Sequence, residues 1–460
     1  MRRSHRRPYY FLAVALLTGF VAAVAPAWGQ AIEEDFKLFA SDGAMGDRFG
    51  FSVAIENGII AAGAFHDADR GQSSGSVYLF DASTGVEIAK VLPDDGGVNG
   101  QFGISLALDG GVLAVGAIGG TENGTFSGSA YLFDAATGVQ LARLTPNDGG
   151  AFDLFGFSIA MDDGLVAVGA IGDDEGGDGA GAVYLFDAST GVQLAKLVAN
   201  DAEDFDQFGG AVALDNGLVA IGARFDQGNG FGAGAAYLFD AASGTQLAKL
   251  LPDDGMGGAT FGVSIALENG VVAVGANGDD DNGQGAGAVY LFDASTGAQF
   301  AKLLTDDGAS GDQFGLAVVL DEGILAATAL SHDDDTGAEI GAAYLFAVST
   351  GTQLAKLVAS ERPTDDRFGI TIALGEGIAA VGADLDDDPD TETGAVYVYA
   401  IGGVLCPADL TGDGVVDTQD FLLYLGAFAA GDRLADWNSD GEINTLDFLA
   451  YLGDWAAGCP

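Results

Sequence analysis

Two stretches near the C-terminus carry side chains whose types and spacing suit metal chemistry. Within residues 409–420 and 436–447, oxygen-bearing side chains fill positions 1, 3, 5, 9 and 12, and glycine fills position 6. Ca²⁺ prefers many oxygen ligands, and the glycine allows the sharp bend of such a loop. The side chains are Asp409, Thr411, Asp413, Asp417 and Asp420, then Asp436, Asn438, Asp440, Asn444 and Asp447. Val415 and Glu442, at position 7, would each supply a backbone carbonyl. The sequence therefore predicts two bound Ca²⁺ ions.

Each predicted calcium loop runs into a predicted amphipathic helix. The apolar positions are Phe421, Tyr424 and Leu425 after the first loop and Phe448, Tyr451 and Leu452 after the second. Their spacing places them on one helix face, where they can form a small core. Two tandem units of loop and helix, without a helix before the loop, resemble the dockerin family over residues 406–460. The resemblance implies that both loops hold Ca²⁺ and that the domain binds a cohesin-like or other surface-anchoring protein.

The first 30 residues have the pattern of an export signal. Residues 2–7 include four arginines, Phe11–Ala25 is apolar, and Ala27-Trp28-Gly29 suits a cleavage site. The apolar run is short for a membrane span, so we expect a cleaved bacterial-type signal peptide and a secreted or cell-surface protein. Cys406 and Cys459 are the only cysteines and bound the small C-terminal domain. In an exported protein such a pair is expected to form a disulfide.

The rest of the chain is a repeat. A Phe-Gly pair opens each unit, at positions 49, 102, 155, 208, 261, 314 and 368. The unit that starts at Phe261 contains four strand-like segments: Phe261–Leu267, Val271–Ala276, Val289–Phe292 and Phe300–Leu304. Asn-Gly between the first two is a strong hairpin signal. Four antiparallel strands in each of seven units predict a mainly β fold, a seven-bladed propeller over residues 32–401, with the opening phenylalanines in its core. Residues 402–405 then form a linker to a small α-helical domain.

The ring needs a closing strand, because the seventh unit ends at Val396–Tyr399 without a fourth strand. Residues 36–40 precede the first unit, and Lys37 takes the place of a cation that recurs in the fourth strands. Those cations are Lys90, Arg143, Lys196, Lys249, Lys302 and Lys356. We expect residues 36–40 to pair with the last blade and close the propeller. One cation on each outermost strand would also protect an exposed sheet edge from association.

The repeat resembles the FG-GAP family, known from the heads of integrin α subunits, over residues 42–400. The resemblance rests on the Phe-Gly pairs, on Gly-Ala at the ends of the second strands, as in Gly275-Ala276, and on the Tyr-Leu-Phe third strands. Integrin-type repeats carry an Asp-rich calcium loop between the first and second strands. This chain has only tight turns there, such as Glu268-Asn269-Gly270, so it resembles the calcium-free subtype.

Acidic loops are expected to gather on one face of this ring. Loops from second to third strands and loops between blades emerge on the same side. They carry the candidate ligand-face residues Asp279, Asp280, Asp281, Asp333, Asp334, Asp335, Asp386, Asp387 and Asp388. Clustered carboxylates suit a divalent cation or a cationic partner, although none of these loops has a complete ligand spacing. Simple solvation of an acidic surface is the alternative.

The net charge of the chain and its lack of catalytic motifs narrow the classes of function that the sequence supports. The formal net charge is −50, which opposes binding to nucleic acid and to anionic membranes. Beyond the signal, His66 and His332 are the only histidines, they lie in different units, and no catalytic motif is found. No later apolar stretch is long enough to span a membrane. We therefore expect a non-enzymatic binding or adhesion protein whose propeller takes an unknown protein or glycan and whose tail is a calcium-dependent anchor. The alternatives are an extracellular enzyme delivered by the tail to a polysaccharide, and a spacer without a specific ligand.

Overall fold

The computed structural model describes residues 31–228, 230–334, 336–361, 364–387 and 393–402. In the C-terminal region it describes residues 408, 410, 416, 418–430, 435, 437 and 443–457. The expected signal peptide, both cysteines and most predicted calcium ligands lie outside the described residues, so the export signal, the disulfide and the calcium sites remain predictions.

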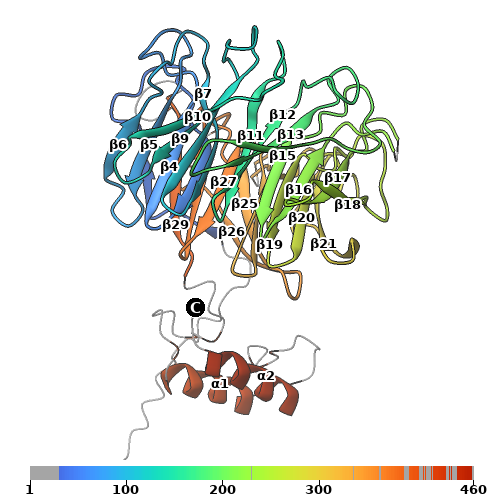
Figure 1. Ribbon diagram of the computed structural model, residues 1–460. Helices are drawn as coiled ribbons and strands as arrows, with labels where there is room; N and C mark the ends of the chain where they lie inside the picture. The colour runs from blue at the N-terminus through green and yellow to red at the C-terminus, as the bar shows by residue number, and fades with distance from the viewer. Residues whose placement is uncertain are drawn as a thin grey trace, which may run out of the picture.

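Seven sheets, built mainly of antiparallel strands, surround a common axis (Figure 1). The first three blades contain β3 (Phe49–Glu56), β4 (Ile59–Ala64), β5 (Ser76–Asp81) and β6 (Glu87–Val91); β7 (Phe102–Asp109), β8 (Val112–Ala117), β9 (Ser129–Asp134) and β10 (Gln140–Leu144); and β11 (Phe155–Asp162), β12 (Leu165–Ala170), β13 (Ala182–Asp187) and β14 (Gln193–Leu197). In each blade the four strands pair in chain order, so the predicted propeller is confirmed.

The fourth to seventh blades repeat this order. They contain β15 (Ala211–Asp215), β16 (Leu218–Ala223), β17 (Ala235–Asp240) and β18 (Thr245–Leu250); β19 (Ser264–Glu268), β20 (Val271–Ala276), β21 (Ala288–Asp293) and β22 (Ala298–Leu303); β23 (Phe314–Asp321), β24 (Ile324–Ala329), β25 (Ala342–Ala347) and β26 (Thr352–Leu357); and β27 (Thr371–Gly375), β28 (Ile378–Ala383) and β29 (Ala395–Ala400). The first strands contact one another around the axis, so they are innermost.

The two faces of the ring differ in their loops. First and second strands are joined by tight turns, as at Asn269 and Gly270, where φ is 50° and 79° and the hairpin expected from the sequence is present. The loops from second to third strands and the loops between blades emerge on the opposite face, the upper side of Figure 1. We call this side the long-loop face.

The core lies between adjacent blades and is built on the Phe-Gly pairs. Phe261 is fully buried, and its ring packs edge-on against Tyr290 and Phe292 at centroid distances of 5.5 and 5.8 Å. The same cluster contains Leu238 and Leu250 of the preceding blade. These contacts confirm the expectation that the opening phenylalanines are core residues.

Paired glycines allow adjacent blades to approach. Gly262 of the fifth blade has φ of 88°, and its carbonyl oxygen lies where a Cβ on Gly222 of the fourth blade would have to be. Gly262 adopts the left-handed angle and Gly222 leaves room for the carbonyl, because neither residue has a side chain. The same contact joins Gly382 of the seventh blade to Gly50 of the first, so it continues across the closure of the ring.

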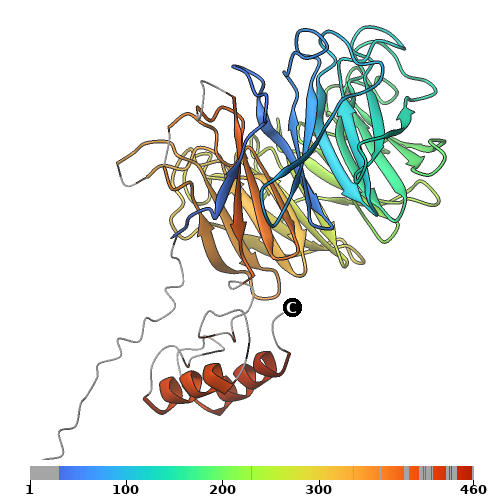
Figure 2. The same cartoon turned by 90° about the vertical axis from the view of Figure 1, so that its left-hand side faces the viewer.

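The N-terminal segment closes the propeller as expected. Strand β2 (Phe36–Leu38) pairs antiparallel with β29, with Lys37 opposite Tyr397. Figure 2 shows this dark blue segment beside the orange last blade. A second short strand, β1 (Ala31–Ile32), pairs parallel with β26 of the sixth blade, which the sequence did not indicate. The segment therefore ties two blades together.

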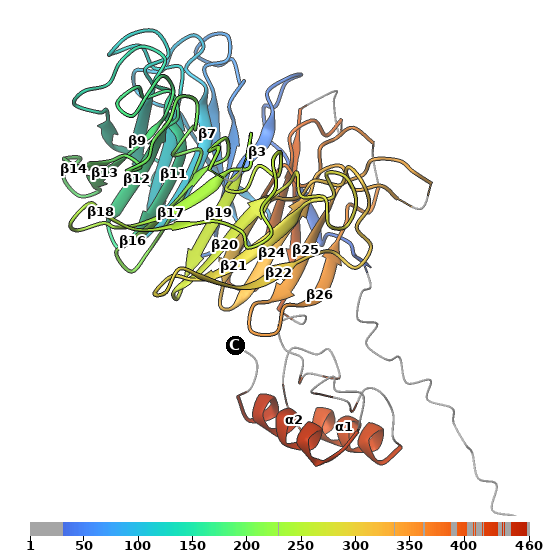
Figure 3. The ribbon, with the colours of Figure 1, turned by 90° about the vertical axis from the view of Figure 1, so that its right-hand side faces the viewer.

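The C-terminal region contains two helices, α1 (Thr418–Ala430) and α2 (Thr445–Ala457), seen clearly in Figure 3. Tyr424 and Tyr451 are buried and stack with centroids 3.8 Å apart and rings 5° from parallel. The two helices follow the predicted calcium loops, as expected. In the described part of the chain, neither these nor any other helix has the length and apolar character needed to cross a membrane.

Candidate functional site

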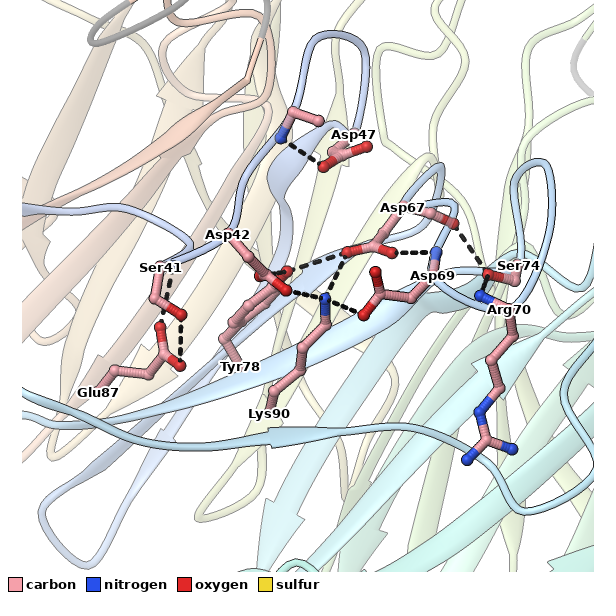
Figure 4. A network of polar contacts seen from close by, with 11 residues as sticks. Ser41, Asp42, Asp47, Asp67, Asp69, Arg70, Ser74, Tyr78, Glu87 and Lys90 are labelled. Atoms are coloured by element: carbon pink, nitrogen blue, oxygen red, sulfur yellow. Dashed lines mark hydrogen bonds and ion pairs between the residues drawn. The ribbon is translucent and has the colours of Figure 1, made fainter.

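The acidic loops of the long-loop face are organised around buried ion pairs. In the first blade, Lys90 Nζ lies 2.9 Å from Asp42, 2.9 Å from Asp67 and 2.7 Å from Asp69. The Tyr78 hydroxyl donates to Asp42 and Asp67 at 2.8 and 2.9 Å. Figure 4 shows these groups converging beneath the loops. Asp67 is only 2% exposed, whereas the side chains of Asp42 and Asp69 are 49% and 46% exposed, so the network extends from the interior to the surface of the acidic face.

The same arrangement recurs around the ring. Lys196 contacts Asp148, Asp173 and Glu175; Lys249 contacts Asp201 and Asp226; Lys302 contacts Asp254, Asp279 and Asp281; and Lys37 contacts Asp386 and Glu361. These lysine side chains are 9–21% exposed. They do not stand in solvent as edge protection would require, and instead neutralise buried carboxylates. The expectation that these cations protect the sheet edge is therefore wrong, because each lysine side chain turns toward the acidic loops.

The network keeps its groups ionised. Burial by itself lowers the pKa of Lys302, but hydrogen bonds to Asp254, Asp281 and Asp279 outweigh it and raise the pKa above its usual value. Burial by itself raises the pKa of Asp254, but hydrogen bonds from Lys302 and Tyr290 outweigh it and lower the pKa. Both partners are thus held in their charged forms at neutral pH.

Some of the candidate ligand-face residues form ion pairs or hydrogen bonds within the protein, and others are exposed to solvent. Asp279 and Asp386 are 2% and 1% exposed and bind the lysines described above, and Asp281 binds Lys302. Asp280 accepts a hydrogen bond from the Gly285 amide at 2.8 Å. Asp334 accepts from the amide and hydroxyl of Thr336, and Asp333 and Asp387 are exposed. Asp335 and Asp388 lie outside the described residues.

These carboxylates are not assembled as a cation site in the described part of the chain, where no group of three or more His, Cys, Asp or Glu side chains is arranged to hold a metal ion. Several of the acidic side chains serve the fold instead. A weak interaction of the exposed ones with cations stays a prediction.

In the sixth blade, His332 takes the place of the buried aspartate. Its Nδ1 lies 2.9 Å from Asp312 Oδ2, and its Nε2 lies 2.6 Å from Lys356 Nζ. Because the ammonium group can only donate, Nε2 is the acceptor and the neutral ring carries its proton on Nδ1, which donates to Asp312. His332 is 5% exposed, so it belongs to the buried part of the network. Its place 53 residues after Asp279 is the signal that reveals the equivalence.

Three of the predicted calcium-loop residues are described. Asp420 and Asp447 are fully buried in the first turns of α1 and α2. Asn444 precedes α2 and its side chain accepts from the Leu446 amide at 2.8 Å, which is an N-cap interaction. The remaining nine, namely Asp409, Thr411, Asp413, Val415, Asp417, Asp436, Asn438, Asp440 and Glu442, lie outside the described residues. Calcium binding by the two loops stays a prediction.

Comparisons with known proteins agree with the repeat. Seven segments match the FG-GAP repeat: residues 32–80, 86–133, 139–186, 192–239, 245–292, 298–346 and 352–399. The chain belongs to the FG-GAP repeat family. Each matched segment of this FG-GAP chain ends with a third strand, so the sequence unit is displaced by one strand from the blade, as closure by β2 requires.

The comparisons with curated proteins and with solved structures do not indicate a function for this chain. No curated protein matches this FG-GAP chain. Among solved structures, it is similar to the crystal structure of the computationally designed Ika8 protein, with 16% identity over 80% of this chain and 100% of that chain. The TM-score of 0.48 is too low to support an argument.

Exposed phenylalanines also occupy the long-loop face of the FG-GAP propeller, and the sequence reasoning missed them. Phe152, Phe205 and Phe231 are 62%, 60% and 85% exposed. Phe152 and Phe205 have φ of 72° and 67°, at a place where three other units have Gly46, Gly258 and Gly311. Such angles are unfavourable for a bulky residue. Comparing this glycine position among the repeats would have found them.

Proposed function

We propose that this FG-GAP protein is a secreted or surface-attached binding protein. The long-loop face of the propeller takes a protein or glycan partner, and the tail anchors the protein in a calcium-dependent manner. The observation that carries the proposal is the set of exposed phenylalanines on that face. Propellers of FG-GAP repeats serve as interaction modules, and the tight turns between first and second strands favour the calcium-free subtype.

The exposed phenylalanines are costly to the free protein, which supports a role in binding. Phe152 and Phe205 combine solvent-exposed rings with left-handed backbone angles. Strain of this kind persists where function requires it. Phe126, with φ of 54°, stacks on Phe152 at a centroid distance of 6.3 Å, so neighbouring loops present a joint aromatic surface. Aromatic side chains are enriched among the residues that dominate binding energy.

The proposed anchor rests on the tandem loop and helix units. Both helices are present, and Asp420 and Asp447 each occupy position 12 of a loop at the start of a helix. The resemblance to dockerins suggests two Ca²⁺ ions and a cohesin-like or other surface-anchoring partner. The N-terminal pattern suggests export, and the proposed disulfide between Cys406 and Cys459 suits an extracellular domain.

A non-catalytic role is part of the proposal. Buried aspartates such as Asp226 and Asp279 bind lysine and tyrosine, so they are committed to ion pairs and are not available as a pair of acid and base. An enzyme acting on polysaccharide is the alternative. Release of soluble sugar from a polysaccharide by the purified protein, lost on Asp-to-Asn substitution on the long-loop face, would favour that alternative.

The binding proposal is tested by removing the exposed rings. The triple variant F152S/F205S/F231S should bind at least about tenfold more weakly to glycan arrays or to the surface of the producing cells. The control variant V139S/L141S changes side chains that are 59% and 53% exposed at the start of β10, at the outer edge of the second blade. It should bind normally. Equal binding by both variants and the wild type would reject the long-loop face as the binding surface.

A further inference from the structure

The second blade departs from the buried network at two places. The place of Asp67 is filled by Asp173, Asp226, Asp279, His332 and Asp386 in other blades, and by Gly120 in the second. The place two residues before the Phe-Gly pair is filled by Asp47, Asp153, Asp206, Asp312 and Asp366, by Ala259 in the fifth blade, and by Gly100 in the second. The second blade alone has glycine at both places.

A cavity of about 280 Å³ occupies this part of the second blade. Gly100 and Gly120 line it together with Phe102, Tyr131, Arg143 and Glu122. The side chains of Asp95 and Glu122 are 45% and 54% exposed, so the rim is open to solvent. The cavity therefore lies where carboxylates stand in most other blades, and small solutes can reach it.

The groups that hold the carboxylate elsewhere are still present. In the first blade, Asp67 accepts from Lys90 Nζ at 2.9 Å, from the Tyr78 hydroxyl at 2.9 Å and from the Asp69 amide at 2.8 Å. The equivalent donors in the second blade are the Arg143 guanidinium, the Tyr131 hydroxyl and the Glu122 amide, at the same spacing in the sequence.

Arg143 keeps two of the three carboxylate partners that its counterpart Lys90 has. Its Nη1 lies 2.6 Å from both Asp95 and Glu122, and its Nη2 donates to Ser129 at 2.8 Å. Lys90 has three carboxylates around one cation, whereas Arg143 has two. A single added negative charge therefore reproduces the local charge balance of the first blade.

We propose that this cavity binds a small monocarboxylic acid, whose carboxylate takes the place that Asp67 has in the first blade. Charge-assisted hydrogen bonds from Arg143, Tyr131 and the Glu122 amide hold the carboxylate. Phe102 and Ala117 in the wall suit a short apolar tail. Dianions and polyanions are disfavoured by the net charge of −50. The site is separate from the exposed phenylalanines, so it does not depend on the function proposed above.

Titration of the full mature chain with propionate and benzoate at pH 7 tests the site. The Glu122 backbone amide, followed by NMR, should shift saturably, and each acid should bind at least about tenfold more tightly than propionamide or benzamide, which lack the charge. Equal shifts by acids and amides, or no saturable shift by either acid, would overturn the proposal.

Two substitutions return a carboxylate to the cavity. G120D should weaken binding of both acids at least about tenfold, because its own side chain then takes the site. A Cβ on Gly120 would lie 2.7 Å from Ser129 Oγ and 2.8 and 3.0 Å from the Gly128 carbonyl carbon and oxygen, so the Gly128 backbone must shift to admit the aspartate. If G120D fails to fold, G100D decides the question, since the nearest atoms to its Cβ would be the Gly97 and Ser74 carbonyl oxygens, at 3.0 and 3.1 Å. G426D, on the exposed face of α1, adds the same charge elsewhere and should bind normally. Wild-type affinity in the folded cavity variants would reject the site.

Discussion

Lys302 and Asp254 form an ion pair of 2.8 Å although 48 residues separate them. Asp254 belongs to the loop that enters the fifth blade, and Lys302 belongs to the last strand of that blade. The pair thus joins the beginning and the end of one repeat, and its equivalents do so around the ring. Long loops that would otherwise be loosely held are fixed by these contacts.

Replacing Lys302 by methionine should destabilise the propeller by about 2–4 kcal/mol, because Asp279 would remain buried without its cation. Urea unfolding at pH 7 measures the loss. Arginine occupies the equivalent place in the second blade, as Arg143, so K302R should lose less than half as much. Equal losses for the two variants would show that the charge at this position does not matter.

Asp206 provides a test of pH dependence. Burial raises its pKa to about 6, and its Oδ1 has no hydrogen-bond partner among the described residues. The folded state therefore binds the proton more tightly than the unfolded state, and the stability present below about pH 4 is lost as the pH rises through 6. D206N should raise the free energy of unfolding by about 1 kcal/mol at pH 8, after solvent screening, and leave it unchanged at pH 4.

The matched control for Asp206 is D254N. The pKa of Asp254 is lowered, so its contribution is present above the unfolded value of about 4 and is lost as the pH falls through the folded value. D254N should therefore destabilise the protein at pH 8, and this effect should shrink as the pH falls below about 4. The same pH profile for both variants would contradict the burial argument.

Removing residues 32–41 should open the ring. The deletion takes away β2, whose Leu38 is 1% exposed, and exposes the edge of β29. We expect the melting temperature to fall by about 5–10 °C, relative to a chain that starts at residue 31. An unchanged melting curve would mean that β2 contributes nothing to closure.

Phe261 and Phe300 form a matched pair for the core. Phe261 is fully buried between two blades, and Phe300 is 51% exposed on β22. F261A should cost about 3–5 kcal/mol, whereas F300A should stay within about 0.5 kcal/mol. Denaturant unfolding of the two variants side by side gives the comparison.

Calcium binding can be followed without isolating the tail. Beyond the expected signal peptide, the only tryptophans are Trp437 and Trp455, and both pack in the helical region, Trp437 on Tyr451 and Trp455 on Phe421. Chelator should shift tryptophan emission to longer wavelength, and added Ca²⁺ should reverse the shift, because binding stabilises the folded tail. The variant D420N/D447N should respond weakly. Emission unaffected by chelator would argue against calcium loops.

Much of the fold could be read from the sequence, since strand periodicity, turn residues and the repeated Phe-Gly pair are local signals. The position of Lys37 revealed the closing strand, because it matched a place in a known pattern. The buried network could not be read in the same way. Lys302 meets Asp254 and Asp279 only through the three-dimensional course of the loops, so the acidic residues looked like free surface ligands.

Departures from the repeat carried more information than the repeat itself. His332, Gly120 and Phe152 each stand where most other units have a different residue type, and each marks a change in chemistry. The parallel pairing of β1 with β26 had no such signal, because two residues are too few to show a strand pattern.

Closure by β2 has a kinetic consequence. Leu38 pairs with Val396, so the last blade is complete only when two segments more than three hundred residues apart have met. Contacts so distant along the chain form slowly. Until these segments meet, the polypeptide must keep an unclosed ring with two unpaired sheet edges apart from other copies. The pairing of β2 with β29 therefore sets how long the unclosed propeller can associate wrongly with other copies.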